Sequence, residues 1–364
     1  MIDNRMEDSG MKDNRIQDNR IQDNRMEDNG MKDNRMEDKE NYLSTLNERQ
    51  LDAVTTTEGY VRIIAGAGTG KTKALTHRYA YLVNELGIST SNILCVTFTN
   101  KAAREMSKRI RQMIGDSDTG YICTFHGFCV KLLREDIHAI NFPQNFVVMD
   151  DEDTEEILKT VYENAHIQSR TYTFDSARDH ITALKSQMLH IPYLAEIGNE
   201  KLLADYEKAE KVEDKVFLGY LYEQKKVYGL DYDDLITIAL YILQTDETKR
   251  IKWQERMMYV MVDEFQDVSN SQYALAEILS GYHRNLFIVG DPDQTIYTWR
   301  GAQIEYILEF DETHENTRTI FLDMNYRSTP EILAVSNSLI EKNKKRLPPV
   351  SYTHLRAHET RSNL

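Results

Sequence analysis

A glycine-rich turn between an apolar segment and a helical one constrains the fold more than any other feature. Val61–Ala65 has the character of a short buried strand, and Ala65–Thr72 follows it directly. Glycines let backbone N–H groups close around phosphate oxygens, and the N-terminus of the next helix adds a favourable dipole. Lys71 can then reach the β- and γ-phosphates of a nucleotide, and Thr72 can ligate Mg²⁺. Ala65 replaces the usual first glycine, so this is a relaxed form of the motif; an ordinary glycine-rich turn is the disfavoured alternative.

Two acids end a second apolar segment. Asp263 and Glu264 directly follow Tyr259–Val262. Parallel α/β sheets bind ligands beside the carboxyl ends of their strands. Asp263 suits Mg²⁺, which takes few carboxylates and keeps its waters, and Glu264 suits the orientation or deprotonation of an attacking water. Such a pair alone is more often solvated surface, but together with the phosphate loop it predicts a site for Mg²⁺ and a nucleotide.

Apolar segments alternate with helical ones along the middle of the chain. Asn92–Phe98, Leu286–Val289 and Thr319–Leu322 are predicted strands, and Asn100–Ile110 is a predicted helix with Thr99 or Asn100 as its N-cap. This alternation predicts an α/β fold with a parallel sheet. Residues 149–223 are charged and strand-poor with helical periodicity, which indicates a helical subdomain inserted into the sheet domain.

The N-terminal segment is a pentapeptide repeat in which Asp recurs at every fifth position from Asp3 to Asp38. That period fits neither a helix nor a strand. Residues 1–40 carry eight basic and twelve acidic side chains, so we expect a disordered tail. A protein-binding arm and a translated short DNA repeat are the alternatives. Residues 350–364 have no periodic pattern and are interpreted as a non-native tail.

Composition sets the remaining bounds. A hydrophobic fraction of 41% in 364 residues fits a globular protein, and no apolar run approaches the roughly 18 residues of a membrane span. No secretory signal is visible, so we expect a cytoplasmic protein with reduced thiols at Cys95, Cys123 and Cys129. The net charge of −15 argues against broad polyanion binding. It leaves room for a narrow single-strand groove that grips by aromatic stacking.

Eight segments follow one another along the chain: Leu46–Gln50, Ala65–Thr72, Val96–Met106, Thr124–Phe128, Leu230–Leu235, Val262–Asp267, Val289–Ala302 and Leu322–Thr329. In this order they resemble the motifs, from the Q-motif through motif IV, of the UvrD/PcrA/Rep group of superfamily 1 ATP-dependent DNA helicases. The resemblance implies a RecA-like P-loop sheet with an inserted helical subdomain and only the start of a second RecA-like domain. The first RecA-like domain is expected over 41–148 and 224–318, and the remnant of the second over 319–349.

The resemblance also implies roles around a bound ATP. Gln50 would read the adenine edge, Tyr326 would stack on adenine, and Gln294 would contact the γ-phosphate and couple it to the DNA groove. Arg327 would act as an arginine finger, which stabilises charge developing in phosphoryl transfer. The nucleotide contacts are then Gln50, Ala65, Gly66, Ala67, Gly68, Thr69, Gly70, Lys71, Thr72, Lys73 and Tyr326. The Mg²⁺ ligands are Thr72 and Asp263, and the catalytic residues are Glu264, Gln294, Arg327 and Lys71.

A DNA path is implied as well, for single-stranded DNA and junctions of single- and double-stranded DNA. Its expected residues are Phe98, Asn100, His126, Tyr232, Tyr297, Trp299 and Arg300. Each base offers a π-face, so aromatic stacking holds a strand without reading its sequence. Core packing is the commoner fate of a strand-end aromatic and is the alternative at each position.

The chain also departs from the family pattern. Lys73 stands where the family usually has Arg, and Tyr232 where it has Phe. Motifs V and VI, with the second arginine finger, are absent from the sequence. We therefore expect a 3′-to-5′ helicase fragment that binds nucleotide weakly and hydrolyses it poorly. A P-loop small-molecule kinase, a non-catalytic nucleotide- and DNA-binding module, and a subunit of a helicase–nuclease are the competing hypotheses.

Overall fold

The computed structural model describes residues 42–115, 118–298, 301–342 and 352–353. The chain divides into two compact units, Met1–Asn47 and Glu48–Leu364. The described part of the first unit is a helical turn in which Leu46 N donates to Leu43 O at 3.0 Å. The predictions for residues 1–40, and those for 350–364 other than 352–353, lie outside the described residues.

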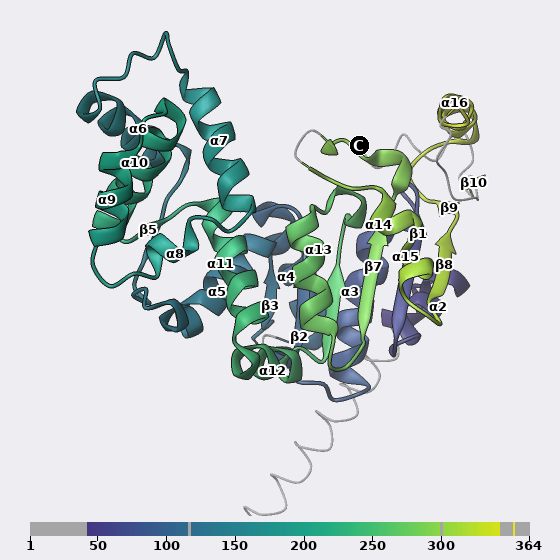
Figure 1. Ribbon diagram of the computed structural model, residues 1–364. Coiled ribbons are helices and arrows are strands. Elements are labelled where there is room, and N and C mark those ends of the chain that lie inside the picture. Colours follow the sequence, from purple (N-terminus) through teal and green to yellow (C-terminus); the bar gives the residue numbers. More distant parts are fainter. Residues whose placement is uncertain (1–41, 116–117, 299–300, 343–351, 354–364) are drawn as a thin grey trace, which may run out of the picture. The chain divides into compact units, whose positions relative to one another are not determined.

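The second unit carries all the labelled elements (Figure 1). Its strands are β1 (Tyr60–Ala65), β2 (Ile93–Val96), β3 (Tyr121–Cys123), β4 (Val147–Val148), β5 (Gly229–Leu230), β6 (Tyr259–Val262), β7 (Leu286–Gly290), β8 (Arg318–Leu322), β9 (Met324–Asn325) and β10 (Tyr352–Thr353). Its α-helices are α2 (Glu48–Thr55), α3 (Lys71–Asn84), α4 (Asn100–Ile114), α5 (Phe125–Asp136), α6 (Asp151–Asn164), α7 (Phe174–Ser186), α8 (Ile191–Leu194), α9 (Glu200–Lys208), α10 (Val212–Lys226), α11 (Tyr232–Thr245), α12 (Glu247–Arg256), α13 (Asn270–Ser280), α14 (Glu305–Leu308), α15 (Phe310–Thr313) and α16 (Pro330–Ile340). Short 3₁₀ turns are η1 (Thr90–Asn92), η2 (Ile137–Ile140), η3 (Phe265–Asp267) and η4 (Pro292–Gln294).

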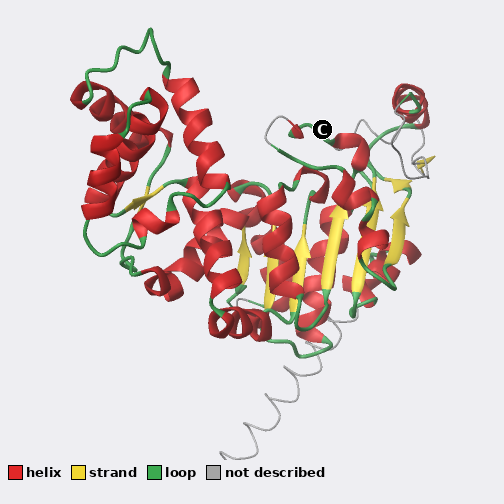
Figure 2. Ribbon diagram, viewed as in Figure 1, coloured by secondary structure: helices red, strands yellow, loops and turns green. Residues whose placement is uncertain are grey.

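Six strands form one sheet in the order β3-β2-β6-β7-β1-β8 (Figure 2). Every neighbouring pair is parallel. The strand β7 lies between β1 and β6, with Val289 opposite Ile63 and Ile288 opposite Val262. All six strands therefore end at the same edge of the sheet, and the loops after β1, β6 and β7 are neighbours there.

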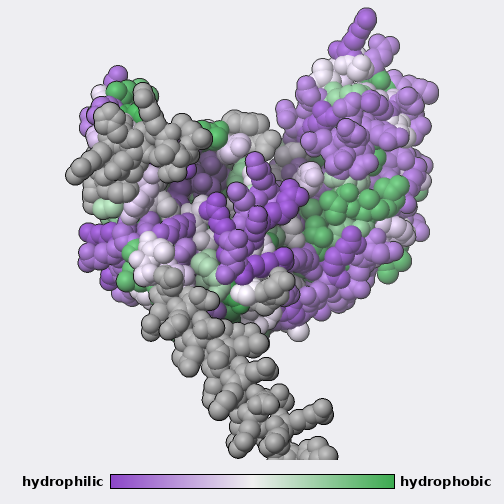
Figure 3. All heavy atoms as spheres, turned by 180° about the vertical axis from the view of Figure 1, so that it is seen from behind, coloured by the Kyte–Doolittle hydropathy of each residue, from purple (hydrophilic) through white to green (hydrophobic). Residues whose placement is uncertain are grey.

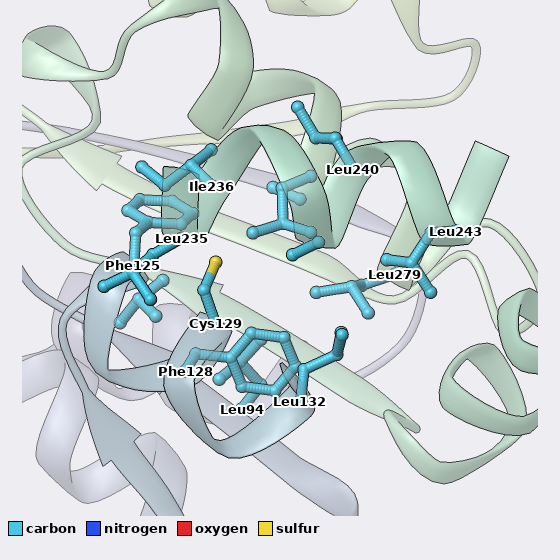
Figure 4. Packing of buried hydrophobic residues seen from close by; sticks show 14 of the residues in the cluster. Leu94, Phe125, Phe128, Cys129, Leu132, Leu235, Ile236, Leu240, Leu243 and Leu279 are labelled. Carbon is cyan, nitrogen blue, oxygen red and sulfur yellow. The ribbon is translucent and has the colours of Figure 1, made fainter. Parts of the chain in front are cut away.

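Helices cover both faces of this sheet, which explains the continuous apolar runs of its central strands. Alternate residues of a strand point to opposite faces. Val61 and Ile63 of β1 join a core with α2, α3 and α4, whereas Ile64 joins a core with α5, α11 and α13. Figure 4 shows part of the second core, where Phe128 and Leu132 of α5 lie below the apolar side chains of α11.

A helical insertion forms a third core of its own. The helices α6, α7, α9 and α10 pack around Leu158, Leu202 and Tyr220, which are all buried. The chain enters and leaves the insertion through the two-stranded parallel pair of β4 and β5. Carboxylates cap the helices that flank this neck: Asp150 forms a capping box with α6, and Asp231 does the same with α11.

The predicted α/β fold with a parallel sheet and a helical insertion is confirmed. The structure adds β3, which the sequence analysis did not identify. It also differs at the end of the sheet, because the strand assigned to a second domain from residue 319 is the edge strand of the first sheet. Here β8 pairs with β1, and Ile320 and Leu322 are buried. By contrast, α16 buries none of its side chains.

The surface seen from behind is mostly hydrophilic, with apolar side chains gathered in one strip on the side of the insertion (Figure 3). Within the described ranges, none of the helices combines the length and the apolar character needed to cross a membrane. Cys95, Cys123 and Cys129 are free thiols.

We predict that Leu132→Ala lowers the free energy of unfolding by about 2–5 kcal/mol, because a fully buried leucine leaves a cavity when it is truncated. Urea denaturation followed by circular dichroism measures the change. Leu86→Ala is the matched control, since Leu86 is 43% exposed and the same truncation should cost little there. Equal losses in the two variants would contradict this account of the core.

Candidate functional site

The candidate residues follow the strands in the order that the sheet dictates. Along the carboxyl edge, His126 lies after β3, Phe98 after β2, Glu264 after β6, Gln294 after β7 and Tyr326 after β8. The phosphate loop, after β1, lies between the last two. The predicted nucleotide residues thus occupy one half of the edge and the predicted DNA residues the other. The β7 loop begins in the nucleotide half, where it carries Gln294. It extends to the DNA half, where it carries Tyr297.

The phosphate loop is held open by two glycines and by hydrogen bonds from outside it. Gly68 and Gly70 have φ values of 76° and 90°, in the left-handed region that side chains disfavour. The Gln50 amide donates to Thr69 O at 3.0 Å, and Tyr326 N donates to Gly68 O at 2.9 Å. These contacts tie α2 and the end of β9 to the loop, so its shape is set before any ligand binds.

The Asn325 side chain makes further hydrogen bonds that hold the phosphate loop. Its amide donates to Ala67 O at 2.5 Å, and its carbonyl oxygen accepts from the backbone N–H groups of Arg327 and Ser328, each at 2.8 Å. The side chain is buried. The segment that carries Tyr326 and Arg327 is therefore fastened to the loop by the residue immediately before it.

Lys71 reaches across the sheet to the acids after β6. Its Nζ lies 3.1 Å from Oε2 of Glu264, which also accepts from the Gln266 amide at 3.0 Å. Glu264 adopts φ 48° and ψ 46°, a left-handed conformation that costs a residue with a side chain about 1–2 kcal/mol. Strain of this kind persists where the surroundings enforce it, and it gathers at functional positions.

Asp263 is buried beside Lys71 and Glu264, where a negative charge on its carboxylate is unfavourable. Burial, and next the charge of Glu264, raise the pKa of Asp263 to about 6, while Lys71 opposes the shift. The carboxylate accepts from Glu264 N at 3.1 Å and lies 3.5 Å from the Thr97 hydroxyl. A divalent cation would offset the cost of burying this charge. Asp263 and the Thr72 hydroxyl fit Mg²⁺, which takes few protein oxygens when phosphates supply others. At this site, as in the rest of the described part of the chain, no cluster of three or more His, Cys, Asp or Glu side chains could hold a metal.

Gln266 joins the β6 and β7 loops. Its side chain is 1% exposed; the amide nitrogen donates to Glu264, and the amide oxygen accepts from Asp291 N at 3.0 Å. The Gln294 amide donates in turn to the Asp291 carboxylate. An unbroken chain of polar contacts therefore runs from Lys71 through Glu264 and Gln266 to Gln294.

A pocket of about 370 Å³ opens over the phosphate loop. It is lined by Gly66, Ala67, Gly68, Gly70, Lys71, Thr72, Lys73, Arg109, Glu264, Gln294, Tyr326 and Arg327. The structure thus brings together most of the residues predicted for ATP. Gln50, Ala65, Thr69 and the predicted Mg²⁺ ligand Asp263 do not line the pocket; Gln50 holds the loop through its hydrogen bond to Thr69 O. Lys73 lies where burial lowers the pKa of its amine.

Sequence reasoning missed Arg109, Asn325 and Gln266. Arg109 projects from α4 into the wall of the pocket, where it is also 3.9 Å from Glu105. Nothing in the spacing of the α4 residues separates Arg109 from its exposed basic neighbours. Asn325 and Gln266 stand inside the predicted motifs, but only the three-dimensional contacts reveal which loops they join.

On the other half of the edge the aromatic side chains lie in pairs. Phe98 stacks on Tyr297, with ring centroids 4.7 Å apart and 22° between the planes. His126 meets Tyr232 edge-on at 5.4 Å, and Tyr232 is 46% exposed at the start of α11. Asn100 is exposed as the first residue of α4. Trp299 and Arg300, also predicted for the DNA path, lie outside the described residues.

The comparisons with known proteins agree with this geometry. Residues 46–315 match the family described as UvrD/REP helicase N-terminal domain. The chain belongs to the UvrD/Rep helicase family. It is 39% identical to the ATP-dependent DNA helicase PcrA of Staphylococcus aureus strain Mu50 over 312 residues, and 38% identical to PcrA of Staphylococcus epidermidis strain ATCC 12228 over the same length. Each match covers 85% of this chain and 42% of the relative, so the chain spans about two fifths of those proteins.

Within this UvrD/Rep domain we predict that Gly70→Ala weakens nucleotide binding about tenfold or more. A side chain at φ 90° is strained, and the added Cβ would lie 2.5 Å from Nε2 of Gln50, which holds the loop. Titration with a fluorescent ATP analogue measures the affinity. Gly87→Ala is the matched control, because φ is 66° there and the new Cβ would meet nothing within 4 Å. That control should lose stability but keep its nucleotide affinity, and an unaltered affinity in Gly70→Ala would refute the assignment of the loop.

Proposed function

We propose that the chain is the ATP-binding half of a DNA motor that moves 3′-to-5′ along single-stranded DNA at the expense of ATP. One observation carries the proposal: the nucleotide pocket and the aromatic pairs share one sheet edge, and the β7 loop joins them. A P-loop small-molecule kinase would have no use for these half-buried aromatic pairs and the exposed ring of Tyr232 in that position. Membership of the UvrD/Rep family supports the motor over the kinase.

In the nucleotide half of the sheet edge, a few side chains have separate roles. Lys71 and the loop N–H groups bind the phosphates, and Arg327, which lines the pocket, would stabilise charge that develops on the γ-phosphate. Asp263 and Thr72 would hold Mg²⁺, which neutralises phosphate charge when it is bound. Glu264 orients the attacking water and takes its proton. Lys71 lies 3.1 Å from this carboxylate, so the residue that binds phosphate is adjacent to the residue that handles the water.

The DNA half would grip bases by stacking. Phe98, Tyr297 and Tyr232 offer π-faces, and His126 supports Tyr232 from the side. Gln294 and Tyr297 are three positions apart in the β7 loop. A change at the γ-phosphate that shifts Gln294 would therefore move the Phe98–Tyr297 pair. This short connection is the proposed link between hydrolysis and movement along the strand.

A second candidate function is a non-catalytic module that holds nucleotide and single-stranded DNA. It would use the same pocket and aromatic pairs without turnover, whereas a translocating motor closes two domains on each ATP. A helicase subunit of a helicase–nuclease shares the same half-site and remains a third candidate. Hydrolysis separates the first candidate from the second.

We predict that Glu264→Gln keeps ATP binding and lowers turnover about 10²-fold or more, because the amide preserves the shape but cannot accept the proton. ATPase activity is measured with and without oligo-dT for this chain and its Glu264→Gln variant. The S. aureus relative and its variant at the matching glutamate are measured in the same way. The chain alone should turn over slowly and the relative briskly. Brisk DNA-stimulated turnover by the chain would contradict the expected weakness of the isolated half. Normal turnover in both glutamine variants would assign Glu264 another role.

We predict that Phe98→Ala weakens binding of oligo-dT about fivefold to a hundredfold, since stacking contributes about 1–3 kcal/mol per base. Fluorescence anisotropy at several salt concentrations measures the loss, which should not alter the salt dependence because no charge is removed. Tyr282→Ala is the control: Tyr282 is 58% exposed and precedes β7, at the opposite edge of the sheet. Equal effects of the two substitutions would count against a strand path over Phe98.

A further inference from the structure

A fully buried lysine lies where the insertion meets the sheet domain. Lys185 of α7 has no exposed side-chain surface, and its Nζ lies 2.5 Å from Asp231 and 2.7 Å from Asp234. Asp234 is fully buried too. Burial and the charge of Asp231 raise the pKa of Asp234, while Lys185 opposes that shift. One cation with no exposed surface is thus shared by two carboxylates, of which Asp234 is fully buried and Asp231 is 12% exposed.

Further side chains of the insertion complete this cluster. The Tyr220 hydroxyl donates to Asp231 at 2.7 Å, and the Gln224 amide donates to Asp234. His190 Nε2 lies 3.2 Å from Asp234, and burial lowers the pKa of His190 to about 3, so its ring is neutral. The cluster therefore draws on α7, α10 and the segment before α8. Buried charges tolerate little displacement from their partners, so such a cluster fixes geometry more than it adds stability.

The two carboxylates of the cluster also begin α11. Asp231 is the N-cap residue and accepts from Asp234 N at 3.1 Å, while Asp234 accepts from Asp231 N at 3.0 Å. Between them stand Tyr232 and Asp233, and Asp233 is bound by the Thr182 hydroxyl of α7 at 2.7 Å. Of residues 231–234, the three aspartates are thus held by the insertion. The remaining residue, Tyr232, has its ring against that of His126.

We propose that the cluster of Lys185, Asp231 and Asp234 positions Tyr232 in the DNA path by fastening the first turn of α11 to the helical insertion. This inference rests on the proposed function. It makes Lys185 a positioning residue: it touches neither nucleotide nor DNA, and acts through the backbone of α11. It also means that the insertion and Tyr232 move together. A bound DNA strand that displaces the insertion therefore also shifts Tyr232, one of the rings on which its bases stack.

Lys225 provides a matched comparison within the insertion. Its Nζ donates to the backbone carbonyls of Tyr193, Glu196 and Gly198, at 2.6 to 2.8 Å, and the contacts made by this amine stay inside the insertion. Loss of either lysine removes a charged anchor from the same subdomain. Of these two lysines, Lys185 contacts the first turn of α11, whereas these three contacts of Lys225 do not reach it.

The test compares Lys185→Met, Tyr220→Phe and Lys225→Met, each alone and combined with Tyr232→Ala. Oligo-dT affinity is measured by anisotropy, affinity for a fluorescent ATP analogue by titration, and folding by thermal melting. Lys185→Met should weaken oligo-dT binding about fivefold or more, and Tyr220→Phe about twofold, with nucleotide affinity unchanged. Lys225→Met should lower the melting temperature without changing oligo-dT affinity. In the Tyr232→Ala background, Lys185→Met and Tyr220→Phe should cause no further loss, because they act through the missing ring.

The outcomes separate the inference from the function beneath it. An equal loss with and without Tyr232 would overturn the positioning role, and so would normal oligo-dT affinity in both Lys185→Met and Tyr220→Phe. If Lys185→Met does not fold, Tyr220→Phe decides, since it removes one hydroxyl and keeps the buried ring. Failure of the unaltered chain to bind oligo-dT would refute the proposed function, and the inference with it.

Discussion

The contact between Lys71 and Glu264 depends on strand order more than on either residue. The two side chains are separated by 193 positions in the chain and lie 3.1 Å apart. They meet because β1 and β6 are parallel neighbours of β7, so the loops that follow the three strands open at one edge. An order that placed more strands between β1 and β6 would separate the phosphate loop from the acids. The whole site, including the strained backbone of Glu264, is a consequence of that arrangement.

A buried amide makes this edge more than a set of adjacent loops. Gln266 contacts Glu264 with its nitrogen and the backbone of Asp291 with its oxygen, so both ends are satisfied only when the β6 and β7 loops keep their spacing. The β7 loop also holds the Gln294 amide on the Asp291 carboxylate and, further along, Tyr297 against Phe98. It therefore touches both groups of predicted site residues.

The sequence predicted what local pattern determines and missed what depends on distant pairing. The strand over Tyr259–Val262 and the cap of α4 at Thr99 were predictable, because apolar runs and capping residues act within a few positions. The strand β3 has three half-buried residues and no period to recognise. Residues 319–322 were correctly predicted as a strand, but the sheet they join is decided by pairing with β1, which no local pattern encodes. The partners of Lys185 are hidden for the same reason: Asp231 lies 46 positions away.

The net charge of the chain and its capacity to bind a single DNA strand at one place are separate properties. A formal charge of −15 repels a polyanion at long range, and salt weakens that repulsion beyond about 10 Å. At contact distance the surroundings of Phe98 differ, because α4 begins two residues later and carries Lys101, Arg104 and Lys108 on its exposed side. Stacking on uncharged rings is insensitive to the global field, and nearby cations need to offset only the phosphates of the few nucleotides they reach. An acidic protein with aromatic pairs at one sheet edge can therefore hold a single strand locally while rejecting nucleic acid elsewhere on its surface.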